Sequence, residues 1–167
     1  MKKYSGIIWS LVIIVLIVGS LILISRSKID SSSPVVQFSN GVISAEETAF
    51  DFGTISMAKG KVSHSFKIKN TGSEPLTISK IYTSCMCTEA TFIKGDVRKG
   101  PVGMAGHGYV PKINEALNVG EEAEILVFYD PAAHGPAGLG KTERAIFLEN
   151  NGKNPKLEIL IKANVAP

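Results

Sequence analysis

Residues 7–24 form a run of 18 residues without a charged side chain, and this run restricts the folds open to the chain more than any other feature. As an α-helix it would be about 27 Å long, enough for the hydrocarbon core of a thin bilayer. A helix of a small globular domain has a polar face, and this run has no such face. We therefore expect a membrane-spanning helix and, after it, a separate domain.

The run could instead be a cleaved signal peptide or a buried core helix. A signal peptide has a shorter apolar region, of about 7 to 15 residues, followed by a cleavage site between small residues. Here the run leads directly into Ser25, Arg26, Ser27 and Lys28, so we expect it to be retained as an anchor over residues 1–28. Two lysines precede the run, and two basic residues partly offset by Asp30 follow it. The positive-inside rule then predicts a single-pass protein with a cytoplasmic N-terminus and an extracytoplasmic C-terminal domain.

The rest of the chain divides into a linker and one domain. Residues 29–45 are rich in serine and turn-forming residues, which is typical of a linker. Residues 46–167 are numerous enough for one domain with its own core. From Ser31 onward the chain has 14 Lys or Arg and 14 Asp or Glu, and therefore no net charge. A neutral domain without a basic cluster gives no reason to expect nucleic acid as a partner.

Short strands dominate the predicted domain. Residues 62–69 alternate strictly, with Val62, His64, Phe66 and Ile68 on one face, which is the pattern of a half-buried strand. A turn is predicted at 70–75, then a strand at 76–82 whose alternation slips as at a bulge. Further strands are expected at 49–55, 124–129, 144–149 and 157–162. Six or seven short strands in about 120 residues predict an all-β fold, an immunoglobulin-like β-sandwich.

Residues 135–142, Gly-Pro-Ala-Gly-Leu-Gly-Lys-Thr, match the phosphate-loop pattern G-x-x-x-x-G-K-[ST]. That loop works only with a helix directly after it, because the helix N-terminus helps to hold the phosphates. Residues 143–149 are strand-like in composition and too few for such a helix. We therefore expect a glycine-rich hairpin loop here and no bound nucleotide.

Cys85 and Cys87 are the only cysteines in the chain. On a regular strand the Cα atoms of residues i and i+2 are ~6.5 to 7 Å apart, at the far edge of disulfide geometry. Three interpretations stay open: buried free thiols in a core strand, a strained and reducible disulfide, and a site for a soft metal such as Cu(I) or Zn(II).

Three further residues are candidate ligands for such a metal: Met104, His107 and His134. All three lie in glycine-rich segments, where the alternative is an ordinary surface loop. Met104 and His107 fall within 93–120, which is long for a connection whose only predicted structure is a helical turn at 115–117. The nearest histidine after Cys87 is twenty residues away, a spacing that argues against a blue-copper site. His64, on the apolar face of its strand, is expected to be a core histidine.

Three stretches together resemble a bacterial family, domain of unknown function 1573. Residues 50–55, 65–78 and 84–88 are similar to its "DFG-T-I", "F-x-x-x-N-T-G-x-x-P-L-x-I" and "C-x-C-T" signatures, and the resemblance covers roughly Glu46 to Val165. It implies an immunoglobulin-like sandwich related to major-sperm-protein and abnormal-spindle/Hydin type domains, usually exported and without an established catalytic activity. Met86 stands where the family commonly has glycine between the cysteines.

The sequence therefore predicts a membrane-anchored, extracytoplasmic module that does not catalyse a reaction and binds a partner, such as a protein of the cell envelope. The first alternative is an envelope protein that binds copper or zinc through Cys85 and Cys87. A remote alternative is a cysteine transpeptidase like the membrane-anchored sortases, with Cys85 as nucleophile. The residue order argues against it, because about 80 residues follow Cys85 and His64 lies only one hairpin before it.

Overall fold

The structure is a computed structural model that describes residues 13–17, 20 and 38–167. The chain divides into two compact units, Met1–Val36 and Gln37–Pro167. Residues 13–17 are helical and belong to the predicted anchor. The rest of that run, and most of the predicted linker, lie outside the described residues. Within the described residues, no helix combines the length and the hydropathy that a membrane span requires.

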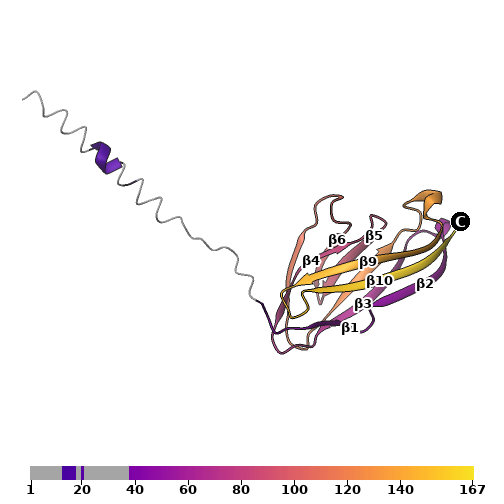
Figure 1. The fold of residues 1–167 in the computed structure, drawn as a ribbon, viewed down its shortest axis with the longest axis horizontal. Helices are drawn as coiled ribbons and strands as arrows, with labels where there is room; N and C mark the ends of the chain where they lie inside the picture. Colours follow the sequence, from indigo (N-terminus) through magenta and orange to yellow (C-terminus); the bar gives the residue numbers. More distant parts are fainter. Residues whose placement is uncertain (1–12, 18–19, 21–37) are drawn as a thin grey trace, which may run out of the picture. The chain divides into compact units, whose positions relative to one another are not determined.

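The described part of the second unit is built from strands in two sheets (Figure 1). Sheet 1 has the order β1-β3-β8-β5-β6, and sheet 2 has the order β2-β10-β9-β4-β7. Neighbouring strands are antiparallel except β2 and β10, which are parallel. The strands are β1 (Ile43–Ala45), β2 (Ala49–Ser56), β3 (Val62–Asn70), β4 (Leu76–Thr83), β5 (Thr88–Lys94), β6 (Val97–Val102), β7 (Lys112–Leu117), β8 (Glu122–Tyr129), β9 (Gly140–Asn150) and β10 (Lys156–Ala166); two short 3-10 helices are η1 (Met57–Lys59) and η2 (Gly135–Gly138).

The core lies between the two sheets, as the alternation in the sequence predicts. In β3, Phe66 and Ile68 are buried while the lysines that follow each of them are exposed. Sheet 2 contributes branched side chains to the same core, such as Ile146 of β9 and Ile159 of β10. The all-β sandwich predicted from the sequence is therefore confirmed.

The expected strands at 49–55, 124–129, 144–149 and 157–162 each lie within an observed strand. The bulge predicted in the strand after residue 75 is also confirmed. In β4 the register shifts between Ile78 and Lys80 with respect to both of its neighbours, β7 and β9.

The long connection predicted at 93–120 is wrong, because β6 and β7 lie within it, and the helical turn predicted at 115–117 belongs to β7. One face of β7 carries Ile113, Glu115 and Leu117. Because Glu115 is charged, the sequence here lacks the apolar alternation by which a strand is recognised. The carboxylate of Glu115 is partly buried and pairs with Lys94 and Lys99, at 4.0 and 3.3 Å. Strand β1 also lies inside the range 29–45 that the sequence assigns to a linker.

Asn70 holds together the end of the sandwich at which residues 38–42 join it. Its side chain is fully buried. The Nδ2 group donates to the carbonyls of Glu74 and Leu117, at 2.8 and 2.9 Å, and Oδ1 accepts from the backbone N–H groups of Val42 and Gly72, at 3.2 and 3.0 Å. This one side chain therefore links the start of β1, the turn after β3 and the end of β7.

We expect Asn70→Ala to lower the free energy of unfolding by about 3 kcal/mol, because it leaves several buried backbone groups without a partner. The measurement is urea denaturation of the full-length chain in a mild detergent, followed by circular dichroism, because the single tryptophan, Trp9, belongs to the apolar run and not to the sandwich. Asn164→Ala is the matched control, since Asn164 is exposed and makes one long contact with Thr54; its effect should stay below about 0.5 kcal/mol. Equal effects of the two substitutions would contradict the role assigned to Asn70.

Candidate functional site

Two loops that cross from one sheet to the other meet at the end of the sandwich opposite to Asn70. Residues 84–87 lead from β4 in sheet 2 to β5 in sheet 1, and residues 130–139 lead from β8 back to β9. Tyr129 at the end of β8 pairs with Thr88 at the start of β5. The backbone N–H of Asp130 then donates to the carbonyl of Cys87 at 2.8 Å. The strand pairing therefore brings the cysteine loop and the histidine loop together.

The two cysteines lie on a tight turn and not on a core strand, so the strand interpretation is wrong for this segment. The N–H of Thr88 donates to the carbonyl of Cys85 at 3.1 Å, which closes the turn. The hydroxyl of Thr83, a buried residue, lies 2.9 Å from the carbonyl oxygen of Cys85 and 3.0 Å from that of Thr88. Met86 occupies the tip of the turn, where its side chain is 59% exposed.

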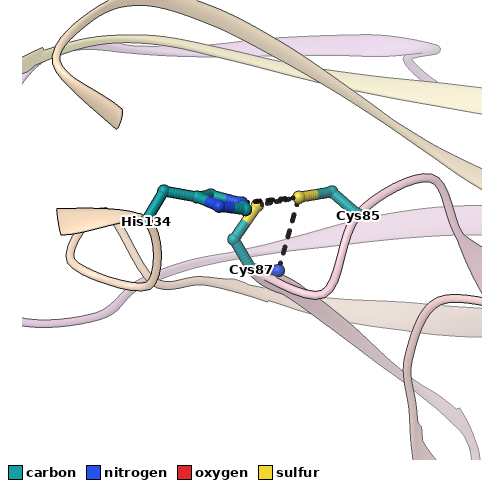
Figure 2. Close-up of side chains that lie close together, drawn as sticks. All are labelled: Cys85, Cys87 and His134. Carbon is teal, nitrogen blue, oxygen red and sulfur yellow. Dashed lines mark hydrogen bonds between the residues drawn. The ribbon is translucent and has the colours of Figure 1, made fainter. Parts of the chain in front are cut away.

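The turn places both sulfurs beside an imidazole (Figure 2). The Sγ atoms of the two free thiols are 2.6 Å apart, and Cys85 Sγ lies 3.1 Å from Nε2 of His134. The ligand atoms of Cys85, Cys87 and His134 all lie within 4.8 Å of one another. Cys87 is buried, Cys85 is half-buried and His134 is exposed. The group is therefore fixed on the protein side and open to solvent on the histidine side.

Arg144 of β9 completes the surroundings of the thiols. Its Nε donates to Cys87 Sγ at 3.2 Å, and its Nη1 donates to the carbonyl of Glu143 at 2.8 Å. Its neighbour Ala145 joins β9 to the cysteine turn: the backbone N–H of Ser84 donates to the carbonyl of Ala145, and the N–H of Ala145 donates to the hydroxyl of Ser84, both at 2.9 Å. Nothing in the sequence marks Arg144 as a site residue, because it lies 57 positions after Cys87.

The surroundings move the two thiol pKa values in opposite directions. Burial acts to raise the pKa of Cys85, but hydrogen bonds from the side chain and backbone of Cys87, the contact with His134 and the charge of Arg144 outweigh it and lower this pKa to about 7. Burial and the hydrogen bond to Cys85 raise the pKa of Cys87, although Arg144 and Thr88 act against them. Cys85 is therefore the thiol that ionises first.

Of the five candidate ligands in the sequence, the structure groups Cys85, Cys87 and His134. His107 is exposed and is not part of this group. The backbone of Met104 pairs with Thr83, two residues before Cys85. His64, expected to be a core histidine, is partly buried, stacks on Phe50 and contacts the carboxylate of Glu47.

The segment that matches the phosphate-loop pattern, residues 135–142, is a short 3-10 helix followed by a strand. Residues 135–138 form η2, and β9 begins at Gly140. The element that follows the loop is therefore a strand, as the composition of 143–149 predicts. A strand offers no helix N-terminus to a phosphate group.

Several solved structures are similar to this chain, and the first of those described here shares its fold. A protein of unknown function from Porphyromonas gingivalis is 17% identical, with a TM-score of 0.56; the match covers 80% of this chain and 51% of that one, so this chain spans about half of its length. The secreted serine protease VesC from Vibrio cholerae (11% identity, TM-score 0.47) matches over 75% of this chain and 24% of its own. The ASH/PapD-like domain 7 of human CEP192 (13% identity, TM-score 0.44) matches over 74% of this chain and 84% of its own. No curated protein matches this sequence.

The family comparison concerns the first half of the sandwich. Residues 43–112 match the family model described as "Protein of unknown function (DUF1573)". The matched residues include the Asn-Thr-Gly turn at Asn70 and both cysteines, whereas His134 and Arg144 lie beyond them. The resemblance to the DUF1573 family is thereby confirmed over residues 43–112.

Proposed function

We propose that this chain is a membrane-anchored, extracytoplasmic and non-catalytic immunoglobulin-like module that binds a soft metal ion, copper(I) or zinc(II), through Cys85, Cys87 and His134. The observation that carries the proposal is the convergence of three ligand atoms within 4.8 Å of one another. Thiolate and imidazole are the ligands that these two metals favour. Two loops fixed by backbone hydrogen bonds supply them, so little ordering is needed on binding.

Binding requires a small opening of the pair. Two sulfurs that bind one zinc ion tetrahedrally at ~2.3 Å lie ~3.7 Å apart. The Sγ atoms, now 2.6 Å apart, must therefore separate by roughly 1 Å. Cys85 is half-buried and Cys87 is buried, so we expect Cys85 to be the residue that moves. The exposed side of His134 leaves access for a further ligand from solvent or from a partner protein of the envelope.

The proposed location follows from the apolar run at 7–24 and its flanking charges. An outward-facing domain works where thiols are not kept reduced by the cytosolic glutathione system. A metal that engages both thiolates protects the pair from oxidation in that compartment. The proposed contacts of the chain are the membrane, through residues 7–24, and a protein partner, with neither nucleic acid nor nucleotide.

A second candidate function is a cysteine transpeptidase, favoured by the 3.1 Å contact between Cys85 and His134. The histidine beside the cysteine is then His134 and not His64. The two functions differ in their need for Cys87. Cys87→Ser removes a metal ligand and leaves the contact between Cys85 and His134 in place, so a peptide- or thioester-cleaving activity that survives this substitution would favour the transpeptidase.

The orientation can be measured with alkaline phosphatase fused after Pro167, because this enzyme folds to its active form outside the cytoplasm. We expect an active fusion in intact cells. Replacing Lys2 and Lys3 together by asparagine removes the positive charge before the run and should give a mixture of orientations. An inactive, cytoplasmic fusion of the unmodified chain would contradict the extracytoplasmic location.

Metal binding can be measured on the full-length chain in detergent, under anaerobic conditions, by competition with chromophoric chelators of Cu(I) and Zn(II). We expect one ion per chain. Removing a residue that hydrogen-bonds to a metal ligand lowers metal affinity by up to ~100-fold. Cys85→Ser and Cys87→Ser remove the ligands themselves and should therefore lower the affinity by more than ~100-fold. His134→Ala should weaken binding, and the matched control His107→Ala should leave it unchanged. Equal effects of the two histidine substitutions would remove His134 from the site.

The lowered pKa of Cys85 predicts the reactivity of the reduced, metal-free chain. The rate of alkylation by iodoacetamide should rise with pH and reach half of its plateau near pH 7, against about 9 for an unperturbed thiol. Cys87→Ala removes the thiol that donates to Cys85 and should move this midpoint upward. Mass spectrometry of the modified peptide identifies the cysteine that reacts. A midpoint near 9 in the unmodified chain would show that its surroundings do not stabilise the thiolate.

A further inference from the structure

The positive charge of Arg144, beside the thiols, affects which metal ion the site can bind. Arg144 touches Cys87 Sγ at 3.2 Å through Nε and is held in place by the carbonyl of Glu143. Burial acts to lower the pKa of Arg144, but its hydrogen bond to Cys87 and the charges of both thiols raise it. A guanidinium is charged at every pH at which the protein is folded. Arg144 is therefore a permanent positive charge next to the ligand atoms.

We infer that Arg144 makes the site selective for a monovalent ion, Cu(I), over Zn(II), an inference that rests on the proposed metal-binding function. Two thiolates, a neutral imidazole and the guanidinium together carry one negative charge. Cu(I) brings this total to zero, whereas Zn(II) leaves one positive charge. A partly buried site disfavours an uncompensated charge, because the charge has lost much of its hydration.

The size of the effect follows from the distance between the two cations. A metal bound to Cys87 Sγ at ~2.3 Å lies about 5 to 6 Å from the guanidinium. At an effective dielectric constant of about 20, each additional unit of positive charge on the metal then weakens binding roughly 100-fold. Zn(II) carries one such unit more than Cu(I). Arg144 should therefore shift the ratio of the two affinities by about two orders of magnitude.

Among the described residues, no carboxylate forms an ion pair with Arg144. The carboxylate of Glu143 pairs with Lys162 of β10 at 3.1 Å, and adjacent residues of a strand point to opposite faces. The carboxylate of Asp130 accepts from the N–H of Ala132 within its own loop, at 2.9 Å.

The two ions also differ in what they require beyond the three protein ligands. Structural zinc sites almost always have four ligands. The group of histidine, cysteine and acidic residues found in the described part of the chain supplies three, so zinc would need the further ligand for which the exposed side of His134 leaves access.

The test compares Arg144→Gln with the unmodified full-length chain in detergent, by anaerobic competition titrations with Cu(I) and with Zn(II) at one pH. The quantity measured is the ratio of the two affinities. Both metals displace the same thiol protons, so a change in thiol pKa cancels in this ratio. We expect Arg144→Gln to lower the Cu(I) to Zn(II) ratio by roughly 100-fold. Arg144→Lys keeps the charge and should change the ratio by no more than about tenfold.

Lys153→Gln is the matched control, because it removes an equal charge at the far end of β9, where residue 153 is exposed, and should leave the ratio unchanged. Circular dichroism confirms that each variant is folded. An unmodified chain that binds neither metal would overturn the proposed function and this inference with it. A chain that binds both metals with a ratio unaffected by Arg144→Gln, or affected equally by Arg144→Lys, would overturn the role of Arg144 alone.

Discussion

The site depends on one buried hydroxyl group. The Oγ1 atom of Thr83 lies within 3.0 Å of the carbonyl oxygens at both ends of the cysteine turn, those of Cys85 and Thr88. Where the chain leaves one sheet and enters the other, its backbone carbonyls lose their partners on neighbouring strands. A buried carbonyl without a hydrogen-bond donor is costly, so other donors have to replace them. Thr83 has one hydroxyl proton for these two carbonyls, and the carbonyl of Cys85 also accepts from the N–H of Thr88 at 3.1 Å, so the turn can be tight. Its tightness in turn brings two sulfurs of residues i and i+2 together.

The sandwich topology brings His134, the third candidate ligand, to the two cysteines. His134 comes from a different crossing, between β8 and β9, and reaches the cysteines because the end of β8, at Tyr129, pairs with the start of β5, at Thr88. The same pairing places Asp130 against Cys87, so the two loops share a backbone hydrogen bond. Arg144 enters from β9, the strand that the second crossing leads into. The hydrogen bonds of the sheets therefore bring the two loops and Arg144 to the same end of the sandwich.

Much of the fold can be predicted from the sequence, because the alternation of β3 and the turn at Asn70 are local patterns. Strands β6 and β7 escape prediction for a local reason as well: β6 contains Gly100 and Pro101, and β7 carries Glu115 on its inward face. The site is harder, since it depends on which loops share one end of the sandwich. His107 and His134 both lie in glycine-rich segments, so the sequence does not distinguish them. Only the order of the strands in the sheets shows which of the two lies beside the cysteines. Arg144 could not be predicted as a site residue, because its sequence context is that of an ordinary strand.

The separation of the two ends of the sandwich has a consequence for how the site is presented. Residues 38–42 join at the end held by Asn70, and the thiols lie at the other, with strands of eight to eleven residues between them. At about 3.3 Å per residue these strands span roughly 25 to 35 Å. The sandwich thus sets a fixed distance between residues 38–42 and the end that carries the thiols, and this distance depends on the number of residues in each strand.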